Sequence, residues 1–308
     1  MNSTSPKETL FQELTDIVGK EQVLIGEPMA RHTTFEVGGP AQFFVVPVGQ
    51  NQTEELLDFL TFKQVPYFVL GRGSDLVVSD EGFPGVVVDL SQGLTDVEVD
   101  GDNLMAQAGV SLIDLSEMAA ALSLSGLEFA CGIPGTVGGA VYMNAGAYGG
   151  TISDVIKSAR VRFQDGIIKT LSAEELDFGY RMSKVRAEKL TVLSATFQLT
   201  PCEPETIRTA MQDFTERRSS KQPLELPSAG SAFKRPAGYF AGKLVGDAGL
   251  SGYQVGGIQV SEKHNGFLVK VGDATASDVY KLVRHIQDEV RRQFGVDLET
   301  EIQFLGNF

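Results

Sequence analysis

Residues 132–150 read GIPGTVGGAVYMNAGAYGG, and seven of these nineteen residues are glycine. Glycine in the interior of a helix or strand is less favourable than alanine by about 0.5–1 kcal/mol, so this density is atypical of a packed element. Main-chain N–H groups that lie directly against a bulky anion, most often a diphosphate, provide a reason for it. A glycine-rich turn inside a strand-rich domain is the alternative interpretation of the same residues.

A second glycine run, Gly71-Arg72-Gly73-Ser74, follows the apolar stretch Tyr67–Leu70. Two such loops in neighbouring parts of the chain could hold one dinucleotide from two sides. The spacing is not that of a Rossmann fingerprint, in which GxGxxG closes a strand and opens a helix. A Walker loop is also excluded, because no GK[ST] follows either run. The glycines therefore favour a dinucleotide diphosphate held in a different kind of loop.

The overall composition indicates a soluble protein of the cytoplasm. The 308 residues carry a formal net charge of −14, which argues against nucleic acid and anionic membranes as partners. No apolar run approaches the roughly 18 residues of a membrane span, and the N-terminus lacks the pattern of a signal peptide. Two cysteines cannot form a disulfide framework, and three isolated histidines show no metal-binding spacing, so no metal is expected.

Periodicity and turn signals predict a mixed order of helices and strands. Helices are predicted over residues 8–18, 53–65, 112–124, 204–219 and 276–294, the third with Ser111 as N-cap. Strands are predicted over residues 43–48, 67–70, 85–90, 96–99, 104–108, 156–163, 166–170, 190–200 and 298–305, with a hairpin at Asp165-Gly166. These elements suggest three domains, over residues 1–92, 93–204 and 205–308.

A local reversal of charge follows the fourth predicted helix. Between Arg217 and Lys243 there are six basic residues and one acidic residue, Glu225. Inside this stretch, residues 228–236 read SAGSAFKRP, which combines small residues, an aromatic ring and two cations. That mixture suits an anionic small molecule held by N–H groups, a hydroxyl and cations together. A solvated charged face is the alternative.

Two further sets of polar residues are weaker candidates. Tyr180-Arg181 follows Gly179 at a predicted strand edge, where an arginine most often forms a surface ion pair. Glu299 and Glu301 alternate with apolar residues and share one face of the last predicted strand, which is typical of a solvated face. From the residues alone, the chain is a soluble α/β protein that binds an anionic dinucleotide and a second anion.

Eight sequence blocks in order resemble the family of UDP-N-acetylenolpyruvoylglucosamine reductases, over nearly the whole chain. The blocks are Thr34–Gly39, Leu70–Val78, Gly132–Gly149, Tyr180–Ser183, Gly230–Pro236, Ala241–Leu250, Val260–Asn265 and Leu298–Ile302. The resemblance implies an α+β chain with a flavin-binding fold of the vanillyl-alcohol-oxidase (PCMH) type. Two α/β subdomains, 1–92 and 93–204, would bind FAD, and a third α+β domain, 205–308, would bind substrate. The length of this third region is more similar to the shorter form of the family.

The resemblance also implies an activity and its cofactors. NADPH would reduce a non-covalent FAD, which would then reduce UDP-N-acetylglucosamine enolpyruvate to UDP-N-acetylmuramate for peptidoglycan synthesis. Such an oxidoreductase is expected to act on a small molecule, as a monomer or weak dimer. Hydride addition to the vinyl carbon places negative charge on an enolate, and electrostatic stabilisation of that charge is the largest catalytic task.

Site residues carried over from the family fall into three groups. Arg181 and a protonated Glu301 would stabilise the enolate, and Ser231 would protonate the alpha carbon. The FAD-binding residues would be Gly71, Arg72, Gly73, Ser74, Asp75, Gly132, Pro134, Gly135, Thr136, Gly138, Gly139, Asn144 and Gly146. The substrate-binding residues would be Tyr180, Lys221, Gly230, Lys234 and Arg235. Two of these positions, Asp75 and Arg235, often hold asparagine in the family.

Two other functions remain open on sequence grounds. An FAD-dependent oxidase or dehydrogenase of a small alcohol or sugar would share the fold, and such enzymes often tether flavin to histidine or cysteine. His32 and Cys131 are the candidates near the loops, although their spacing does not indicate a tether. A non-catalytic nucleotide-binding module would explain the glycines but not the ordered set of Tyr180-Arg181, Gly230-Ser231 and Glu301.

Overall fold

The computed structural model describes residues 5–308; the first four residues of the N-terminal stretch considered above lie outside them. The chain divides into two compact units, each assembled from segments that are distant in sequence. Unit 1 comprises the chain up to Ile25, Phe43–Gly71 and Gly85–Glu216, and unit 2 comprises Gly26–Gln42, Arg72–Pro84 and Arg217–Phe308. The division into domains 1–92, 93–204 and 205–308 stays a prediction.

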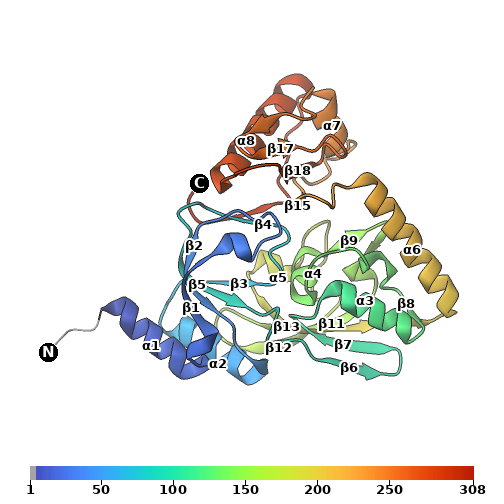
Figure 1. Cartoon of the computed structure of the whole chain (residues 1–308). Helices are drawn as coiled ribbons and strands as arrows, with labels where there is room; N and C mark the ends of the chain where they lie inside the picture. Colours follow the sequence, from blue (N-terminus) through green and yellow to red (C-terminus); the bar gives the residue numbers. More distant parts are fainter. Residues whose placement is uncertain (1–4) are drawn as a thin grey trace. The chain divides into compact units, whose positions relative to one another are not determined.

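A four-stranded sheet, most of whose residues lie in unit 1, and two helices form the first part of that unit (Figure 1). The strand order is β1-β2-β5-β3, with β1 at Val23–Pro28, β2 at Pro40–Val45, β5 at Phe83–Asp89 and β3 at Tyr67–Leu70. Helices α1 (Pro6–Val18) and α2 (Gly49–Phe62) pack side by side, and Leu14 and Leu56 are fully buried in the shared core. β3 and β5 run parallel, as expected for strands joined through a crossover.

A five-stranded antiparallel sheet forms the second part of unit 1. Its order is β12-β11-β13-β7-β6, with β12 at Ile168–Ser172, β11 at Ile156–Arg162, β13 at Thr191–Gln198, β7 at Asn103–Gln107 and β6 at Val97–Asp100. The predicted hairpin at Asp165-Gly166 joins β11 and β12 and is confirmed; Gly166 adopts φ +88° and the Asp165 carboxylate accepts from the Ile167 N–H. Helix α3 (Leu112–Ala121) is also confirmed with Ser111 as its N-cap.

The smaller elements of unit 1 lie between strands of the five-stranded sheet or directly after its last strand. They are the helices α4 (Val137–Met143) and α5 (Lys184–Ala187), and the paired strands β8 (Leu124–Ser125) with β14 (Thr200–Pro201) and β9 (Gly146–Ala147) with β10 (Gly150–Thr151). Helix α6 (Pro204–Lys221) follows and closely matches the predicted helix over residues 204–219.

The glycine density of residues 132–150 is atypical of a packed helix, but the middle of this block is helical. Residues 137–143 form helix α4, which contains Gly138 and Gly139. A Cβ on Gly138 would lie 3.1 Å from the Cβ of Ala108, so glycine lets the helix approach the neighbouring chain closely. Because a seven-residue helix is marginal in isolation, this one depends on its tertiary contacts and on its cap at Thr136. A high glycine content therefore indicates close packing of the backbone in this block, as well as conformational freedom.

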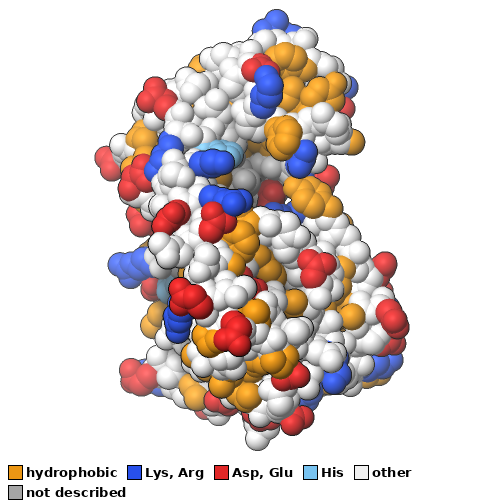
Figure 2. Space-filling view, turned by 90° about the vertical axis from the view of Figure 1, so that its right-hand side faces the viewer, with side chains coloured by type: hydrophobic (Ala, Val, Ile, Leu, Met, Phe, Trp, Pro, Cys, Tyr) orange, Lys and Arg blue, Asp and Glu red, His pale blue; other side chains and the backbone are white. Residues whose placement is uncertain are grey.

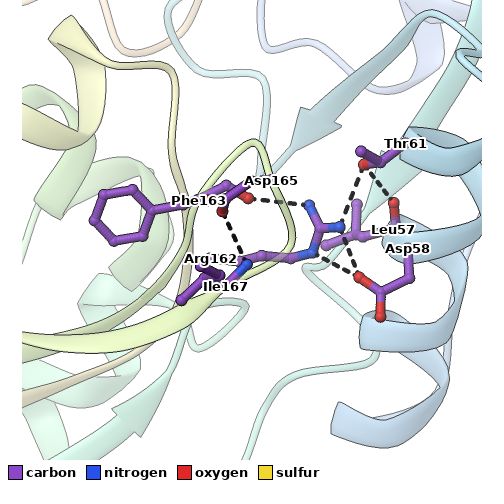
Figure 3. A network of polar contacts seen from close by, with 7 residues as sticks. All are labelled: Leu57, Asp58, Thr61, Arg162, Phe163, Asp165 and Ile167. Carbon is purple, nitrogen blue, oxygen red and sulfur yellow. Dashed lines mark hydrogen bonds and ion pairs between the residues drawn. The ribbon is translucent and has the colours of Figure 1, made fainter.

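A buried cation in unit 1 ties β11 to α2 (Figure 3). The Arg162 side chain is 1% exposed, and its Nε and Nη2 donate to Asp58 Oδ1 at 3.2 and 2.7 Å. Nη2 also donates to Thr61 Oγ1 at 3.2 Å, and Nη1 donates to the Phe163 carbonyl at 3.4 Å. A buried guanidinium is tolerated only when it is paired and hydrogen-bonded, and each of the three nitrogens of Arg162 has an acceptor here.

Unit 2 is built on a four-stranded antiparallel sheet covered by helices. The strand order is β15-β18-β17-β16, with β15 at Ser228–Ser231, β18 at Phe267–Lys270, β17 at Ile258–Val260 and β16 at Gln254–Val255. Helices α7 (Ala241–Asp247) and α8 (Ala276–Phe294) contribute Val245, Leu282 and Ile286 to its core. Helix α8 has the predicted bounds because a capping box starts it at Thr275 and a left-handed Gly295 ends it.

The last predicted strand, over residues 298–305, is mostly not a strand. Only residues 303–305 form one, β19 (Gln303–Leu305), which pairs in parallel with β4 (Leu76–Val78). Residues 301 and 302 form a bend, and Thr300 makes an isolated bridge to Phe233. The apolar alternation is nevertheless real, since Leu298 and Ile302 are buried. The chain changes its pairing partner at the bend, which alternation alone does not reveal.

Charged side chains of both signs are spread over the face shown in Figure 2, and the acidic ones do not gather in one patch there. One acid has a specific structural task in unit 2: the carboxylate of Asp80 accepts from the N–H groups of Ala276 and Ser277 at 2.7 and 2.9 Å. It thereby satisfies donors at the start of α8 that have no partner inside the helix. No helix within residues 5–308 combines the length and apolar character of a membrane span.

Candidate active site

The two glycine loops predicted from sequence meet in unit 1 at Thr136. This side chain is 2% exposed and caps helix α4, with its Oγ1 accepting from the Gly139 N–H at 3.4 Å. A Cβ on Gly71, at the end of β3, would lie 2.4 Å from the same Oγ1. The close approach of these two segments of the chain therefore requires glycine at position 71.

Gly139 is glycine for a different reason. It is exposed, and an added Cβ would meet only the Thr136 Oγ1, at 3.7 Å, which is ordinary contact. Packing within the described chain thus leaves room for a side chain at this position. A flat or anionic group lying against the main chain would instead require its absence. The loop therefore fits a bound diphosphate, and an FAD whose phosphates lie there is compatible with these residues.

The rest of the glycine block shapes the approach to α4. The Gly135 carbonyl accepts from the Leu112 N–H at 3.0 Å, which joins the loop to the start of α3. Pro134 is exposed and Gly132 is half-buried in the preceding turn. Asn144 ends α4 in the left-handed region at φ +43°; its amide donates to the Gly179 carbonyl at 2.9 Å and accepts from the Ser153 N–H at 3.0 Å.

The structure places Arg181 against this block within unit 1. Its Nη2 donates to the Gly146 carbonyl at 3.1 Å, and its guanidinium lies 5.3 Å from the ring centroid of Tyr180, which is 58% exposed. Arg181 adopts φ +53°, a left-handed conformation that is strained for a non-glycine residue. Such strain is found most often at functional sites, where the surroundings hold it in place.

Sequence reasoning missed the residue that fixes this turn. Arg186 Nη1 donates to the Arg181 carbonyl at 2.8 Å and lies 5.8 Å from the ring centroid of Tyr142 in the glycine block, measured from its Cζ. The hydroxyl of Ser183, a residue of the Tyr180–Ser183 block, donates to the Tyr142 carbonyl at 2.8 Å. The ordered position of Ser183 could have suggested its role, but no local pattern pointed to Arg186.

In unit 2, the second part of the Gly71–Asp75 loop is held by residues 32–34. Gly73 adopts φ +58°, and an added Cβ would lie 2.2 Å from the His32 carbonyl oxygen, so only glycine fits. The Thr34 N–H donates to the Gly73 carbonyl at 3.2 Å, and the Thr34 hydroxyl lies 3.4 Å from the Ser74 carbonyl. Arg72 is exposed.

Asp75 ends this loop with its carboxylate engaged inside unit 2. Gln303 Nε2 donates to Asp75 Oδ2 at 2.8 Å, and the Gln303 N–H donates to the Asp75 carbonyl at the same distance. The carboxylate that this chain has in place of the family's frequent asparagine is therefore hydrogen-bonded by a side-chain donor from β19.

Ser231 and Glu301, the other two predicted catalytic residues, lie on neighbouring hydrogen-bonded segments of unit 2. Ser231 ends β15 opposite Phe267, after Gly230 in the left-handed region at φ +71°. The Ala232 carbonyl, next in the chain, accepts from the Glu301 N–H at 2.9 Å. The main-chain pairing of these segments thus carries a hydroxyl and a carboxyl, two groups that can transfer protons, on neighbouring stretches of unit 2.

The predicted substrate cations differ in their surroundings. Lys234 is 11% exposed on its side chain and forms an ion pair with Glu299. Arg235 is exposed; its guanidinium lies 3.9 Å from the ring centroid of Phe240, and its Nε donates to the Tyr239 carbonyl at 3.3 Å. Lys221, the last residue of α6, is exposed.

His264 orders the chain opposite Ser231. Its ring Nδ1 accepts from the Gly266 N–H at 3.1 Å, and the Gly266 carbonyl accepts from the Ala232 N–H at 2.8 Å. Burial lowers the pKa of His264 and outweighs an opposing backbone hydrogen bond, which keeps the ring neutral near pH 7. The block VSEKHN marked this region in the sequence without indicating what the histidine does.

The two candidates for a covalent flavin tether have other contacts. Cys131 Sγ lies 3.7 Å from the Met211 carbonyl and packs on the small cluster of Ala120, Ile207 and Met211. His32 Nε2 lies 3.0 Å from Glu27 Oε1. Within residues 5–308, no group of three or more His, Cys, Asp or Glu side chains is arranged to hold a metal ion.

Comparisons with known proteins show the family of this chain. The family model of an FAD-binding domain matches residues 41–172, and that of the UDP-N-acetylenolpyruvoylglucosamine reductase C-terminal domain matches residues 222–305. UDP-N-acetylenolpyruvoylglucosamine reductase of Clostridium botulinum is 48% identical over 97% of both chains, and that of Alkaliphilus oremlandii is 46% identical over 96% of this chain and 97% of its own.

A solved structure extends the likeness to three dimensions. The reductase of the same name from Thermus caldophilus superposes with a TM-score of 0.78 at 34% identity, covering 92% of this chain and 98% of that one. The predicted α+β class and flavin-binding fold are confirmed, and so is FAD as the cofactor of an oxidoreductase. The chain belongs to the UDP-N-acetylenolpyruvoylglucosamine reductase family.

Proposed function

We propose that this protein uses NADPH to reduce UDP-N-acetylglucosamine enolpyruvate to UDP-N-acetylmuramate, a precursor of bacterial cell-wall peptidoglycan. The observation that carries the proposal is likeness over the full length, at 48% identity, to proteins named as the reductase of this substrate. The match includes residues 222–305, the C-terminal region that distinguishes these reductases from other proteins with an FAD-binding domain.

FAD, when bound, would supply the hydride chemistry, and the protein would supply orientation and electrostatics. Gly71–Asp75 and Gly132–Gly146 would hold the cofactor through main-chain N–H groups. Tyr180, Lys221, Gly230, Lys234 and Arg235 would contact the sugar nucleotide. Lys234 is already neutralised in part by Glu299, so we assign the larger share of phosphate recognition to the exposed Arg235.

Three side chains would act on the enolpyruvyl group. The Arg181 guanidinium, fixed by the Gly146 carbonyl, would stabilise negative charge on the substrate carboxylate as an enolate develops. Glu301 would donate a second hydrogen bond to that charge while its carboxyl carries a proton. Ser231 would deliver the proton to the alpha carbon. A serine hydroxyl is a weak acid, so Ser231 would depend on its fixed position at the end of β15 to transfer a proton efficiently.

The test separates the two half-reactions in an anaerobic stopped-flow instrument. We expect NADPH, and not small alcohols or sugars, to reduce the flavin of the wild type, and enolpyruvyl-UDP-N-acetylglucosamine to reoxidise it. Ser231→Ala should bind FAD and accept hydride normally but reoxidise more slowly by orders of magnitude. A wild type that retains reduced flavin in the presence of the enolpyruvyl substrate would refute the function. Near-normal turnover of Ser231→Ala would refute the role of Ser231 alone.

A further inference from the structure

Residues 299–305 of unit 2 make main-chain contacts to two different segments. The first half of this segment is hydrogen-bonded to the residues that follow Ser231. The Lys234 N–H donates to the Glu299 carbonyl at 2.8 Å, and the Glu301 N–H donates to the Ala232 carbonyl at 2.9 Å. The second half, as β19, pairs in parallel with β4, just after the Gly71–Asp75 loop. Glu301 lies just before the point where the segment stops pairing with the residues after Ser231 and begins to pair with β4.

The first contact after that change is a double one between Gln303 and Asp75. The backbone N–H of Gln303 donates to the Asp75 carbonyl, and its side-chain Nε2 donates to Asp75 Oδ2, both at 2.8 Å. Between Glu301 and Gln303, Ile302 is buried at 3% exposure in the core of unit 2. The backbone that carries Glu301 is therefore fixed at 301 by one hydrogen bond, at 302 by burial and at 303 by two hydrogen bonds.

The chemistry of Asp75 makes this contact directional. An ionised carboxylate only accepts hydrogen bonds, so it pairs with the amino group of the Gln303 amide and not with the amide oxygen. An asparagine at 75 could pair with either end of the glutamine side chain. Aspartate therefore selects one orientation of Gln303, and a bond to a charged acceptor is stronger than one between neutral groups.

We propose that the Asp75–Gln303 pair is a positioning device that sets the backbone of Glu301 relative to the Gly71–Asp75 loop. The proposal rests on the function proposed above, in which Glu301 donates to the developing enolate. Neither Asp75 nor Gln303 acts on the substrate in this assignment. Because a catalytic group displaced by about 1 Å can lose on the order of 100-fold in rate, a pair at this point is enough to control turnover.

Exchange of donor and acceptor tests the pair. Gln303→Glu places two carboxylates at hydrogen-bond distance, and we expect reoxidation of the reduced enzyme by the enolpyruvyl substrate to slow by about 10- to 100-fold. Reduction by NADPH and the substrate Kd should change less than about twofold, because the proposal assigns the pair no contact with either ligand. In the double variant Asp75→Asn/Gln303→Glu, the new amide can donate to the new carboxylate, and the reoxidation rate should return to within about threefold of wild type.

Three controls separate positioning from folding. Asp75→Asn alone keeps an acceptor for Gln303, so its reoxidation rate should fall less than that of Gln303→Glu; because Asp75 belongs to the loop proposed to hold FAD, the FAD Kd of this variant is measured beside its rate. Gln259→Glu removes another amide donor of unit 2, on β17, which donates to the Gly252 carbonyl at 3.2 Å, and it should leave reoxidation unchanged. Melting temperatures of all variants, and the Kd of FAD measured by flavin fluorescence with each apoprotein, report on structure independently of turnover.

Each outcome decides the proposal. Wild-type reoxidation by Gln303→Glu would overturn it, as would a double variant that is no faster than the single one. Equal loss of both half-reactions together with weakened FAD binding would mean a structural role and would also overturn it. If the wild type itself is not reoxidised by the enolpyruvyl substrate, the proposed function has failed, and this proposal fails with it. The two failures can be told apart, because an active wild type with unaffected variants overturns only the positioning role and leaves the proposed function intact.

Discussion

Replacement of Gly71 by alanine should destabilise unit 1 through a single clash. The φ of Gly71 is outside the left-handed region, so alanine can adopt the backbone conformation, and the effect is steric. The new Cβ would lie 2.4 Å from Thr136 Oγ1 and 3.3 Å from its Cγ2. Thr136 is buried and β-branched, so it cannot swing away without moving its neighbours.

The expected magnitude combines two effects. Overpacking of a well-packed interior costs about 1–3 kcal/mol, and displacement of Thr136 from its cap on α4 costs about 1 kcal/mol more. The sum of about 2–4 kcal/mol corresponds to a fall in melting temperature of roughly 5–15 °C for a unit of this size. The loss should be measured on the apoprotein by thermal and urea unfolding, so that FAD binding does not contribute.

A double-mutant cycle isolates the clash. Thr136→Ala removes Oγ1 and Cγ2, and the nearest remaining Thr136 atom, its Cβ, is 3.4 Å from the new methyl group. The double variant Gly71→Ala/Thr136→Ala should therefore be more stable than the sum of the single changes by about 1–3 kcal/mol. Gly139→Ala is the matched control in the same region and should be neutral or stabilising by up to about 1 kcal/mol. A Gly71→Ala protein as stable as wild type, or additive single changes, would refute the reasoning.

Three further predictions follow from the same structure. Gly139→Val should yield a folded apoprotein that takes up no FAD, seen as loss of flavin absorbance at unchanged far-UV circular dichroism; a fully yellow variant would contradict the cofactor loop. Arg181→Ala should keep its flavin spectrum but reoxidise slowly, and Arg181→Gly should be the more stable of the two by about 1 kcal/mol in thermal unfolding, since glycine relieves the left-handed strain; equal stabilities would remove strain from the account. Burial raises the pKa of Asp80, but hydrogen bonds from Ser277 and Ala276 together lower it below its usual value, so its stabilising effect is present above about pH 4 and is lost as pH falls through the lowered pKa. The difference in unfolding free energy between wild type and Asp80→Asn should therefore be largest near neutrality and vanish at low pH, and a pH-independent difference would contradict this.

Local signals in the sequence were sufficient for elements that carry their own boundaries. Helix α8 starts and ends as predicted because its apolar periodicity is framed by a capping box at Thr275 and a glycine at 295. The hairpin at Asp165-Gly166 and the cap at Ser111 follow equally local rules. Helix α4 could not be predicted, because its stability depends on close packing against Ala108, which follows β7, and on its N-cap Thr136, and not on an apolar periodicity of its own.

The identity of the candidate site residues could be predicted from the sequence, but the contacts that hold them in place could not. Arg181, Ser231 and Glu301 could be named from ordered blocks, whereas the strain at Arg181 and its anchor at Arg186 depend on backbone angles and contacts that no local pattern encodes. The final strand was overextended because alternation of buried and exposed residues continues through the bend at 301–302. Alternation reports which side of the chain is buried and does not report which segment the chain pairs with.

Charge is where the sequence was least informative, because the meaning of one charged residue depends on a partner far along the chain. Arg162 is acceptable in the interior of unit 1 only because Asp58, 104 residues away, accepts from it. Asp75 stands out as a negative charge in a loop proposed to hold phosphate, until Gln303, 228 residues away, is seen to donate to it. A departure from a family pattern at such a position therefore has no interpretation by itself. The pair is the unit that can be conserved, exchanged or tested, which is why the exchange of donor and acceptor between residues 75 and 303 is a sharper experiment than either substitution alone.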